Sequence, residues 1–170
     1  MKEQNNLEIE RKYIIKKPDL LALSLCEKYT VSEILQIYMP SEAGETRRVR
    51  RRVYKDKTVC TETKKIRIDN MSSTEIEREI PEDEFEELSH SIKEGTSPII
   101  KSRHTFIFGG QLFEIDIYPQ WQSTAIMETE LETREKSVLM PDFIELIREV
   151  TGEKSYSNAA MSREFPKEII

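Results

Sequence analysis

Charged residues recur at every second position in six segments of this chain that otherwise have the composition of β-strands. Because successive side chains of a strand point to opposite faces, each charged row lies on one face of its strand. The opposite faces include apolar residues such as Phe113, Ile115 and Ile117, which can pack under helices. If the sheet curls into a barrel, the charged faces meet inside it. The rows are Glu8, Glu10 and Lys12; Arg48, Arg50 and Arg52; Glu75, Glu77 and Glu79; Lys101 and Arg103; Glu114 and Asp116; and Glu128, Glu130 and Glu132.

A lumen in which carboxylate rows face rows of Lys and Arg suits a polyanion that is bound together with divalent cations. Carboxylates two residues apart on one strand lie about 7 Å apart, close enough to share a hard cation or its waters. Oxygen-only ligands favour Mg²⁺ or Mn²⁺ over zinc. Guanidinium groups bind phosphate oxygens in a bidentate way, whereas ammonium groups act as point charges. Candidates are Arg48, Arg50 and Arg103 for the first kind, and Lys12, Lys64 and Lys101 for the second.

Composition limits the class of protein. A chain of 170 residues fits one domain, and we expect residues 1–170 to form it. The net charge of −6 disfavours nonspecific binding to nucleic acid or to an anionic membrane, although residues 46–52 are locally basic. Cys26 and Cys60 are too few for a disulfide framework, so a reducing cytoplasm is expected. The sequence has no apolar leader and no long apolar run, so neither secretion nor membrane insertion is expected.

The strand pattern predicts an α+β fold, an eight-stranded antiparallel closed β-barrel (a tunnel) with helices packed on the outside. Short turns such as Gly109-Gly110 favour antiparallel neighbours, and eight strands make the smallest common closed barrel. The expected strands are 7–15, 34–39, 46–54, 57–64, 73–80, 99–108, 111–118 and 125–132.

Helical spacing predicts helices between the strands. One follows Pro18 and Asp19, a second begins at residues 81–84, and a third spans 141–150; a short last helix at 158–163 is left open. Their expected buried residues are Leu20, Leu21, Leu23 and Leu25; Phe85, Leu88 and Ile92; and Phe143, Ile144, Ile147 and Val150.

The ordered motifs resemble those of the CYTH domain, a family also called the triphosphate tunnel metalloenzymes. Residues 8–12 read EIERK, which fits ExExK, and RxR, a strand-ending Lys, ExE, KxR, ExD and ExE follow in order. Lys154, Tyr156 and Asn158 also resemble the family's closing segment, so the similarity covers nearly the whole chain. The resemblance implies a tunnel that binds triphosphate compounds with divalent metal. Members include inorganic and thiamine triphosphatases, class IV adenylate cyclases and RNA triphosphatases.

Matching positions carry the family's site residues onto this chain. Two readings of the Arg-rich strand are open, and we prefer Arg48 and Arg50 over Arg47 and Arg51 because Val49 then faces outward. The implied metal ligands are Glu8, Glu10, Asp116, Glu128 and Glu130. The implied catalytic residues are Lys12, Glu75, Glu77 and Asp116, with a less certain role for Glu114. The implied phosphate-binding residues are Lys12, Arg48, Arg50, Lys64, Lys101 and Arg103.

The resulting hypothesis is a triphosphatase that cleaves inorganic tripolyphosphate by a metal-activated water, with Mg²⁺ or Mn²⁺ as cofactor. No constellation of Ser, Cys or His argues for a covalent intermediate. The alternatives are a class IV-type adenylate cyclase, a non-catalytic polyphosphate-binding module and, disfavoured by its acidic neighbours, nucleic-acid binding through residues 46–52. The expected partner is a small-molecule triphosphate or polyphosphate, with no nucleic acid and no membrane; a homodimer is left open.

Overall fold

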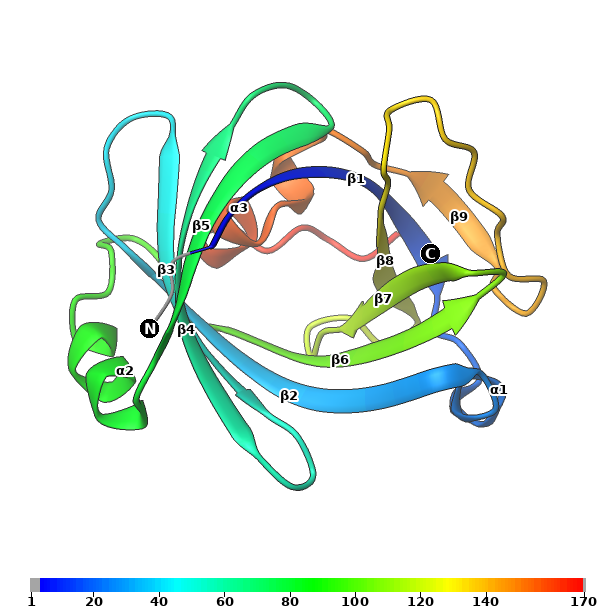
Figure 1. Cartoon of the computed structure of the whole chain (residues 1–170), viewed down its shortest axis with the longest axis horizontal. Helices are drawn as coiled ribbons and strands as arrows, with labels where there is room; N and C mark the ends of the chain where they lie inside the picture. Colours follow the sequence, from blue (N-terminus) through cyan, green and yellow to red (C-terminus); the bar gives the residue numbers. More distant parts are fainter. Residues whose placement is uncertain (1–3, 170) are drawn as a thin grey trace.

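In the computed structural model, which describes residues 4–169, eight antiparallel strands close into a ring (Figure 1). Around the ring the strands follow the order β1-β5-β4-β3-β2-β6-β7-β8, and β8 pairs again with β1. This confirms the predicted antiparallel eight-stranded tunnel. The strands are β1 (Gln4–Lys16), β2 (Glu27–Met39), β3 (Glu45–Val53), β4 (Thr58–Arg67), β5 (Ser72–Ile80), β6 (Ile99–Phe108), β7 (Gln111–Ile117) and β8 (Thr124–Glu130).

Strand β1 closes the ring by changing partners along its length. Residues 4–9 pair with β5, and residues 10–16 pair with β8. A ninth strand, β9 (Leu146–Glu149), also pairs with β1, beyond the ring. The alternation of side chains therefore sends Glu8, Glu10 and Lys12 to the inside of the ring, while Tyr13 and Ile15 face the outer apolar cluster.

The first helix, α1 (Leu20–Ser24), is short and lies at the rim of the ring. Asp19 caps it by accepting a hydrogen bond from the backbone N–H of Leu21. Only Leu23 is buried, whereas Leu20, Leu21 and Leu25 are 51%, 68% and 81% exposed. The prediction that all four leucines are core was wrong, because a five-residue helix turns only one of them toward the apolar cluster.

Helix α2 (Glu82–Ser89) packs on the outside of the ring against β3 and β4 (Figure 1), as predicted. Acidic residues fill its first turn, where they interact favourably with the helix dipole. Its Phe85 is buried in a cluster with Val49 and Cys60, which point outward from the two strands. This cluster fixes which face of β3 is turned to the lumen.

The helix predicted at residues 141–150 is absent, and this segment forms a turn followed by β9. Its apolar residues serve two different clusters. Phe143 and Ile144 pack on the outer face of β6, β7 and β8, whereas Ile147 and Val150 pack in the cluster at one end of the ring. Helical spacing was therefore coincidental, because a single helix face cannot supply two separate clusters.

The C-terminal segment, defined here as residues 150–163, closes one end of the ring. It contains the 3₁₀ turn η1 (Lys154–Tyr156) and α3 (Asn158–Arg163), the short last helix left open by the sequence. Tyr156 and Met161 pack against Ile14 and Ile126, which point inward from β1 and β8. This end of the ring is thus filled with apolar side chains, whereas most residues that line the rest of the interior are charged or polar. No helix among residues 4–169 is long and apolar enough to cross a membrane.

Candidate active site

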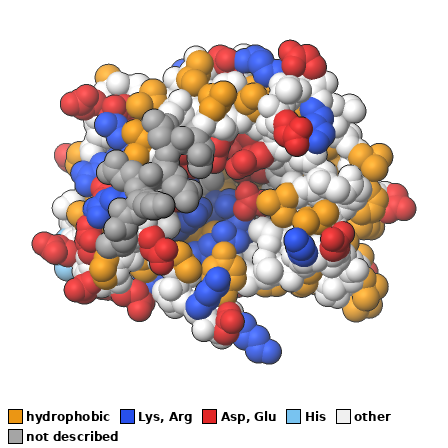
Figure 2. Space-filling model, in the orientation of Figure 1, with side chains coloured by type: hydrophobic (Ala, Val, Ile, Leu, Met, Phe, Trp, Pro, Cys, Tyr) orange, Lys and Arg blue, Asp and Glu red, His pale blue; other side chains and the backbone are white. Residues whose placement is uncertain are grey.

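The ring encloses a cavity of about 670 Å³ whose two walls carry opposite charge. Figure 2 shows Asp and Glu side chains above the hollow and Lys and Arg side chains below it. We call the first set the acidic wall and the second the basic wall. The acidic wall consists of Glu8 and Glu10 on β1, Glu75 on β5, and Glu128 and Glu130 on β8. The basic wall consists of Arg48, Arg50 and Arg52 on β3, and Arg103 on β6.

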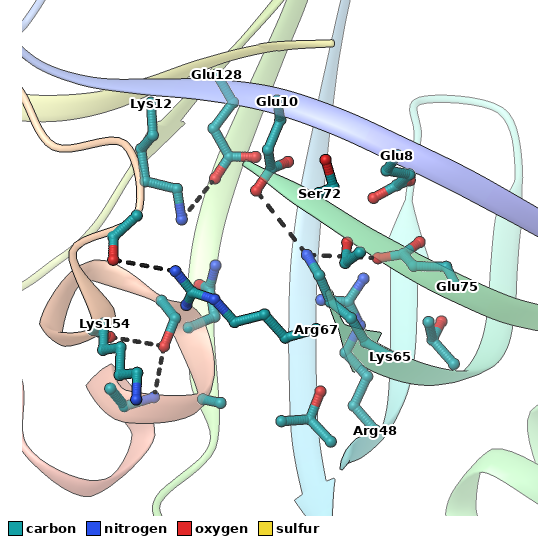
Figure 3. A pocket seen from close by; sticks show the side chains of 18 of the residues that line it. Glu8, Glu10, Lys12, Arg48, Lys65, Arg67, Ser72, Glu75, Glu128 and Lys154 are labelled. Carbon is teal, nitrogen blue, oxygen red and sulfur yellow. Dashed lines mark hydrogen bonds and ion pairs between the residues drawn. The ribbon is translucent and has the colours of Figure 1, made fainter. Parts of the chain in front are cut away.

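Strand register brings the carboxylates of the acidic wall together. Glu10 lies opposite Glu130, and Lys12 lies opposite Glu128, across the β1–β8 pair. Glu75 reaches the same region from β5 (Figure 3). The wall thus joins three neighbouring strands that are distant in sequence.

The acidic wall carries more negative charge than the neighbouring Lys side chains neutralise. Burial, together with the Glu75 and Glu130 carboxylates, raises the pKa of Glu8 to about 9. The Glu128 carboxylate and burial raise the pKa of Glu10, and burial chiefly raises that of Glu130. Protons or cations are therefore bound favourably at this wall.

Glu128 differs from its neighbours because Lys12 neutralises it. The Lys12 ammonium is 3.2 Å from a Glu128 carboxylate oxygen and also donates to the Tyr156 carbonyl at 3.1 Å. Burial alone would raise the pKa of Glu128, but Lys12, with Arg103, lowers it to about 2. Glu128 is thus ionised over the whole physiological pH range.

The basic wall carries more positive charge than the nearby carboxylates neutralise. Burial, together with Arg48 and Arg103, lowers the pKa of Arg50 to about 10, and the nearest carboxylate oxygen, on Glu77, is 3.8 Å away. Among residues 4–169, the buried Arg48 Nε has no hydrogen-bond partner. Such under-partnered guanidinium groups are prepared to bind phosphate oxygens.

The outward residues of β3 make ordinary surface ion pairs. Arg47 pairs with Glu62 on β4, and Arg51 pairs with Glu86 on α2. Val49 lies between them and is fully buried under α2. The structure therefore places Arg48 and Arg50 in the lumen, in the register preferred from the sequence.

Lys101 and Asp116 lie behind the basic wall and do not line the cavity. Both side chains are 1% exposed. Asp116 accepts hydrogen bonds from Arg103 on one oxygen at 2.7 Å and from Arg103 and Lys101 on the other at 2.9 and 2.8 Å. Both oxygens of Asp116 are thus occupied by Arg103 and Lys101, and the roles predicted for Asp116 as a metal ligand and water-orienting residue and for Lys101 as a phosphate ligand stay predictions.

Lys64 also differs from its predicted place. It points out of the ring and lies 3.3 Å from Glu45, whereas the adjacent Lys65 faces the lumen. Lys65 Nζ is 3.9 Å from a Glu10 oxygen and 3.8 Å from a Glu75 oxygen (Figure 3). The two lysines are consecutive and therefore point to opposite faces of β4. The sequence analysis placed Lys64 in the lumen, whereas the structure places Lys65 there.

Further lumen residues were not assigned a role from the sequence. Arg52 continues the Arg48 and Arg50 row, and alternation alone identifies it, but the RxR motif requires only two positions. Arg67 also lines the cavity, where it donates to the carbonyls of Asp69 and Gly152. No motif signals Arg67, since its partners lie in turns. Glu114, which belongs to the same charged row as Asp116, lines the cavity and pairs with Arg103 at 3.0 Å.

The acidic wall fits a hard divalent cation in its donor chemistry. Its five side chains offer carboxylate oxygens, the ligands that Mg²⁺ and Mn²⁺ prefer. The raised pKa values of Glu8 and Glu10 show that positive charge is favoured there. Within residues 4–169, no three acidic, His or Cys side chains already converge on one point, so the carboxylates face one another without forming a closed cage.

Comparison with solved structures identifies similar folds. The inorganic triphosphatase NE1496 superposes with a TM-score of 0.60 at 25% identity, over 94% of this chain and 97% of the other. Protein PH1819 from Pyrococcus horikoshii OT3 matches with a TM-score of 0.56 at 20% identity, over 75% and 80% of the two chains. HpAC1 from Hippeastrum, an adenylyl cyclase-like protein described as having a dominant triphosphatase activity, matches with a TM-score of 0.52 at 17% identity, over 75% and 81%. No protein-family model and no curated protein matches the sequence.

Proposed function

Because the chain has the CYTH-type fold of the triphosphate tunnel metalloenzymes, we propose that it is a triphosphatase that hydrolyses inorganic tripolyphosphate with Mg²⁺ or Mn²⁺. The observation that carries this proposal is the pair of oppositely charged walls inside one ring. A bound polyanion would neutralise the positive charge of the basic wall, and the cations bound with it would neutralise the negative charge of the acidic wall. The similarity to NE1496, an inorganic triphosphatase, supports the same conclusion.

The basic wall would bind the phosphate chain. Arg48, Arg50 and Arg103 point into the lumen from two strands and offer forked N–H donors to successive phosphates. Because phosphoryl transfer needs positioning and charge stabilisation more than covalent help, this rigid set of donors is suited to the task. Lys65 replaces Lys64 in this proposal as the lumen-facing lysine of β4.

The acidic wall would hold the divalent cation through Glu8, Glu10, Glu128 and Glu130. When bound, the cation neutralises phosphate oxygens and makes water more acidic. Lys12 lies 3.2 Å from Glu128 and lowers the pKa of this carboxyl to about 2, which favours the ionised form that a cation requires.

Glu75 and Glu77 would orient the attacking water and accept its proton. Glu77 is held by the Thr63 hydroxyl at 2.8 Å, and Glu75 lies 3.8 Å from Lys65. Water forms a new P–O bond while one anhydride P–O bond breaks, its proton passes to a carboxylate, and the electron pair of the broken bond stays on the leaving pyrophosphate.

The lining favours an all-phosphate substrate over a nucleotide. Tyr38 is the only aromatic residue among the described residues that line the cavity. The other large rings near it, such as Tyr118, Trp121 and Tyr156, are packed in the apolar cluster at the closed end. A nucleobase would therefore find little stacking surface inside the ring.

Phosphate release from tripolyphosphate, ATP and thiamine triphosphate, each with Mg²⁺, Mn²⁺ or EDTA, tests the proposal. We expect metal-dependent release that is fastest with tripolyphosphate, and its loss in Glu10→Gln and Arg50→Ala. The variants change lumen side chains without touching the outer clusters, so their folds should survive. Absence of release from all three substrates would refute a hydrolase, and cyclic AMP with pyrophosphate from ATP would identify a cyclase instead.

A further inference from the structure

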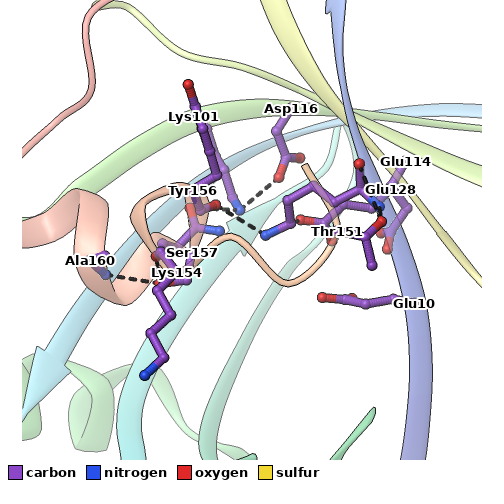
Figure 4. A network of polar contacts seen from close by, with 12 residues as sticks. Glu10, Lys101, Glu114, Asp116, Glu128, Thr151, Lys154, Tyr156, Ser157 and Ala160 are labelled. Carbon is purple, nitrogen blue, oxygen red and sulfur yellow. Dashed lines mark hydrogen bonds and ion pairs between the residues drawn. The ribbon is translucent and has the colours of Figure 1, made fainter. Parts of the chain in front are cut away.

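A buried polar cluster behind the basic wall joins β6 and β7 to the start of α3. Lys101 Nζ donates to Asp116 Oδ2 at 2.8 Å and to Asn158 Oδ1 at 3.3 Å. The Tyr118 hydroxyl donates to the same Asn158 oxygen at 2.9 Å. Arg103 donates to Asp116 through Nε at 2.7 Å and Nη2 at 2.9 Å. Figure 4 shows Lys101 beside Asp116, with the C-terminal segment next to them.

The charged side chains of this cluster are removed from water, so each depends on hydrogen-bond partners within the protein. The side chains of Lys101 and Asp116 are each only 1% exposed, so bulk water cannot replace a lost hydrogen-bond partner. Asn158 supplies the second acceptor for the Lys101 ammonium. A buried ammonium that loses an acceptor bears a large desolvation penalty, and its side chain moves toward its remaining acceptors. Such a movement of Lys101 would disturb Asp116, and through it the Arg103 guanidinium.

We infer that Asn158 is a positioning residue for the basic wall, and this inference rests on the proposed function. Its amide oxygen fixes Lys101, Lys101 fixes Asp116, and Asp116 orients Arg103, which lines the lumen. Asn158 also lines the cavity itself, so the inference is specifically that its effect on the phosphate chain passes through Lys101 and Asp116 to Arg103. In consequence, the C-terminal segment and the phosphate-binding strands form one functional unit.

Replacement of Asn158 separates this role from simple anchoring of α3. Asn158→Ala should lower kcat/KM for tripolyphosphate on the order of tenfold, the loss that one hydrogen bond to a charged group represents. Asn158→Asp keeps the acceptor oxygens and should recover kcat/KM to within about threefold of the parent. Ser162→Ala is the matched control, since it removes a hydrogen bond within α3, to the Ala159 carbonyl, but does not line the cavity and leaves Lys101 untouched. It should lower Tm without changing kcat/KM.

A double-mutant cycle with Arg103→Lys tests the route of the effect. Lysine cannot reproduce the two-pronged contact with Asp116, so in that background Asn158→Ala should cost about twofold or less in kcat/KM. An equal cost in both backgrounds would overturn the inference, as would a loss of activity in Ser162→Ala as large as in Asn158→Ala.

Two further outcomes are decisive. If Asn158→Ala does not fold, Tyr118→Phe removes only the second donor to Asn158 and should show the same non-additivity with a smaller loss. An active parent with an equally active Asn158→Ala variant overturns the inference alone. A parent without turnover refutes the proposed function first, so the two failures are distinguishable.

Discussion

Replacing Glu8 by glutamine should stabilise the metal-free protein, and increasingly so as the pH rises. Burial, with the Glu75 and Glu130 carboxylates, raises the pKa of Glu8 from 4.5 to about 9. A raised folded-state pKa gives stability that is fully present below the unfolded value and is lost as the pH rises through the folded value. Between these limits the parent therefore loses stability that a neutral glutamine does not lose.

The size of the effect follows from the same shift. At 1.36 kcal/mol per unit, the full shift would correspond to about 6 kcal/mol, but the partly exposed side chain is screened by water, so we expect about 2 kcal/mol. For a chain of 170 residues this corresponds to roughly 4–8 °C in Tm. The gain should be present near pH 8.5 and nearly absent near pH 5.

Thermal unfolding in EDTA across this pH range measures the effect. Glu87→Gln on the exposed face of α2 is the control, and its Tm should follow that of the parent at every pH. A Glu8→Gln variant that is no more stable than the parent near pH 8.5, or whose gain does not grow with pH, would refute the account of mutual repulsion in the acidic wall.

Three further predictions follow from the same geometry. Lys65→Gln should lower kcat/KM for tripolyphosphate by roughly tenfold or more, whereas Lys64→Gln, on the outer face, should leave it within about twofold; steady-state assays of both variants compare the two faces directly. Added MgCl₂ should raise the Tm of the parent more at about pH 8.5 than at about pH 6, because protons on the acidic wall compete with the cation; equal shifts at both pH values would contradict this. Phe85→Ala should cost about 3–5 kcal/mol in urea unfolding, since it empties the cluster between α2 and the ring, and a cost below about 1 kcal/mol would argue against that packing.

The ring and much of its lining could be predicted because alternation is a strong signal when both faces are constrained. Glu8, Glu10 and Lys12 could face only one way, since Tyr13 and Ile15 require the outer cluster. The choice between Lys64 and Lys65 failed because consecutive residues of one type leave the register of a strand undetermined.

The partners of Asp116 and the packing of residues 141–150 depend on tertiary contacts, which local sequence patterns do not reveal. The two oxygens of Asp116 are occupied by Arg103 and Lys101, and no local pattern distinguishes a buried counterion from a metal ligand. Likewise, Ile144 and Val150 have helical spacing but pack in different clusters, a fact that only the assembled ring determines.

The change of partners along β1 has a consequence for how the chain folds. Residues 4–9 pair with a strand from the middle of the chain, and residues 10–16 pair with one that comes still later. Such distant pairings are slow to form, because loop-closure entropy is lost before the contacts are gained. Because β1 precedes β5 and β8 in the chain, it leaves the ribosome before either partner. We expect its charged row to disfavour association of the unpaired strand with other chains until the ring closes.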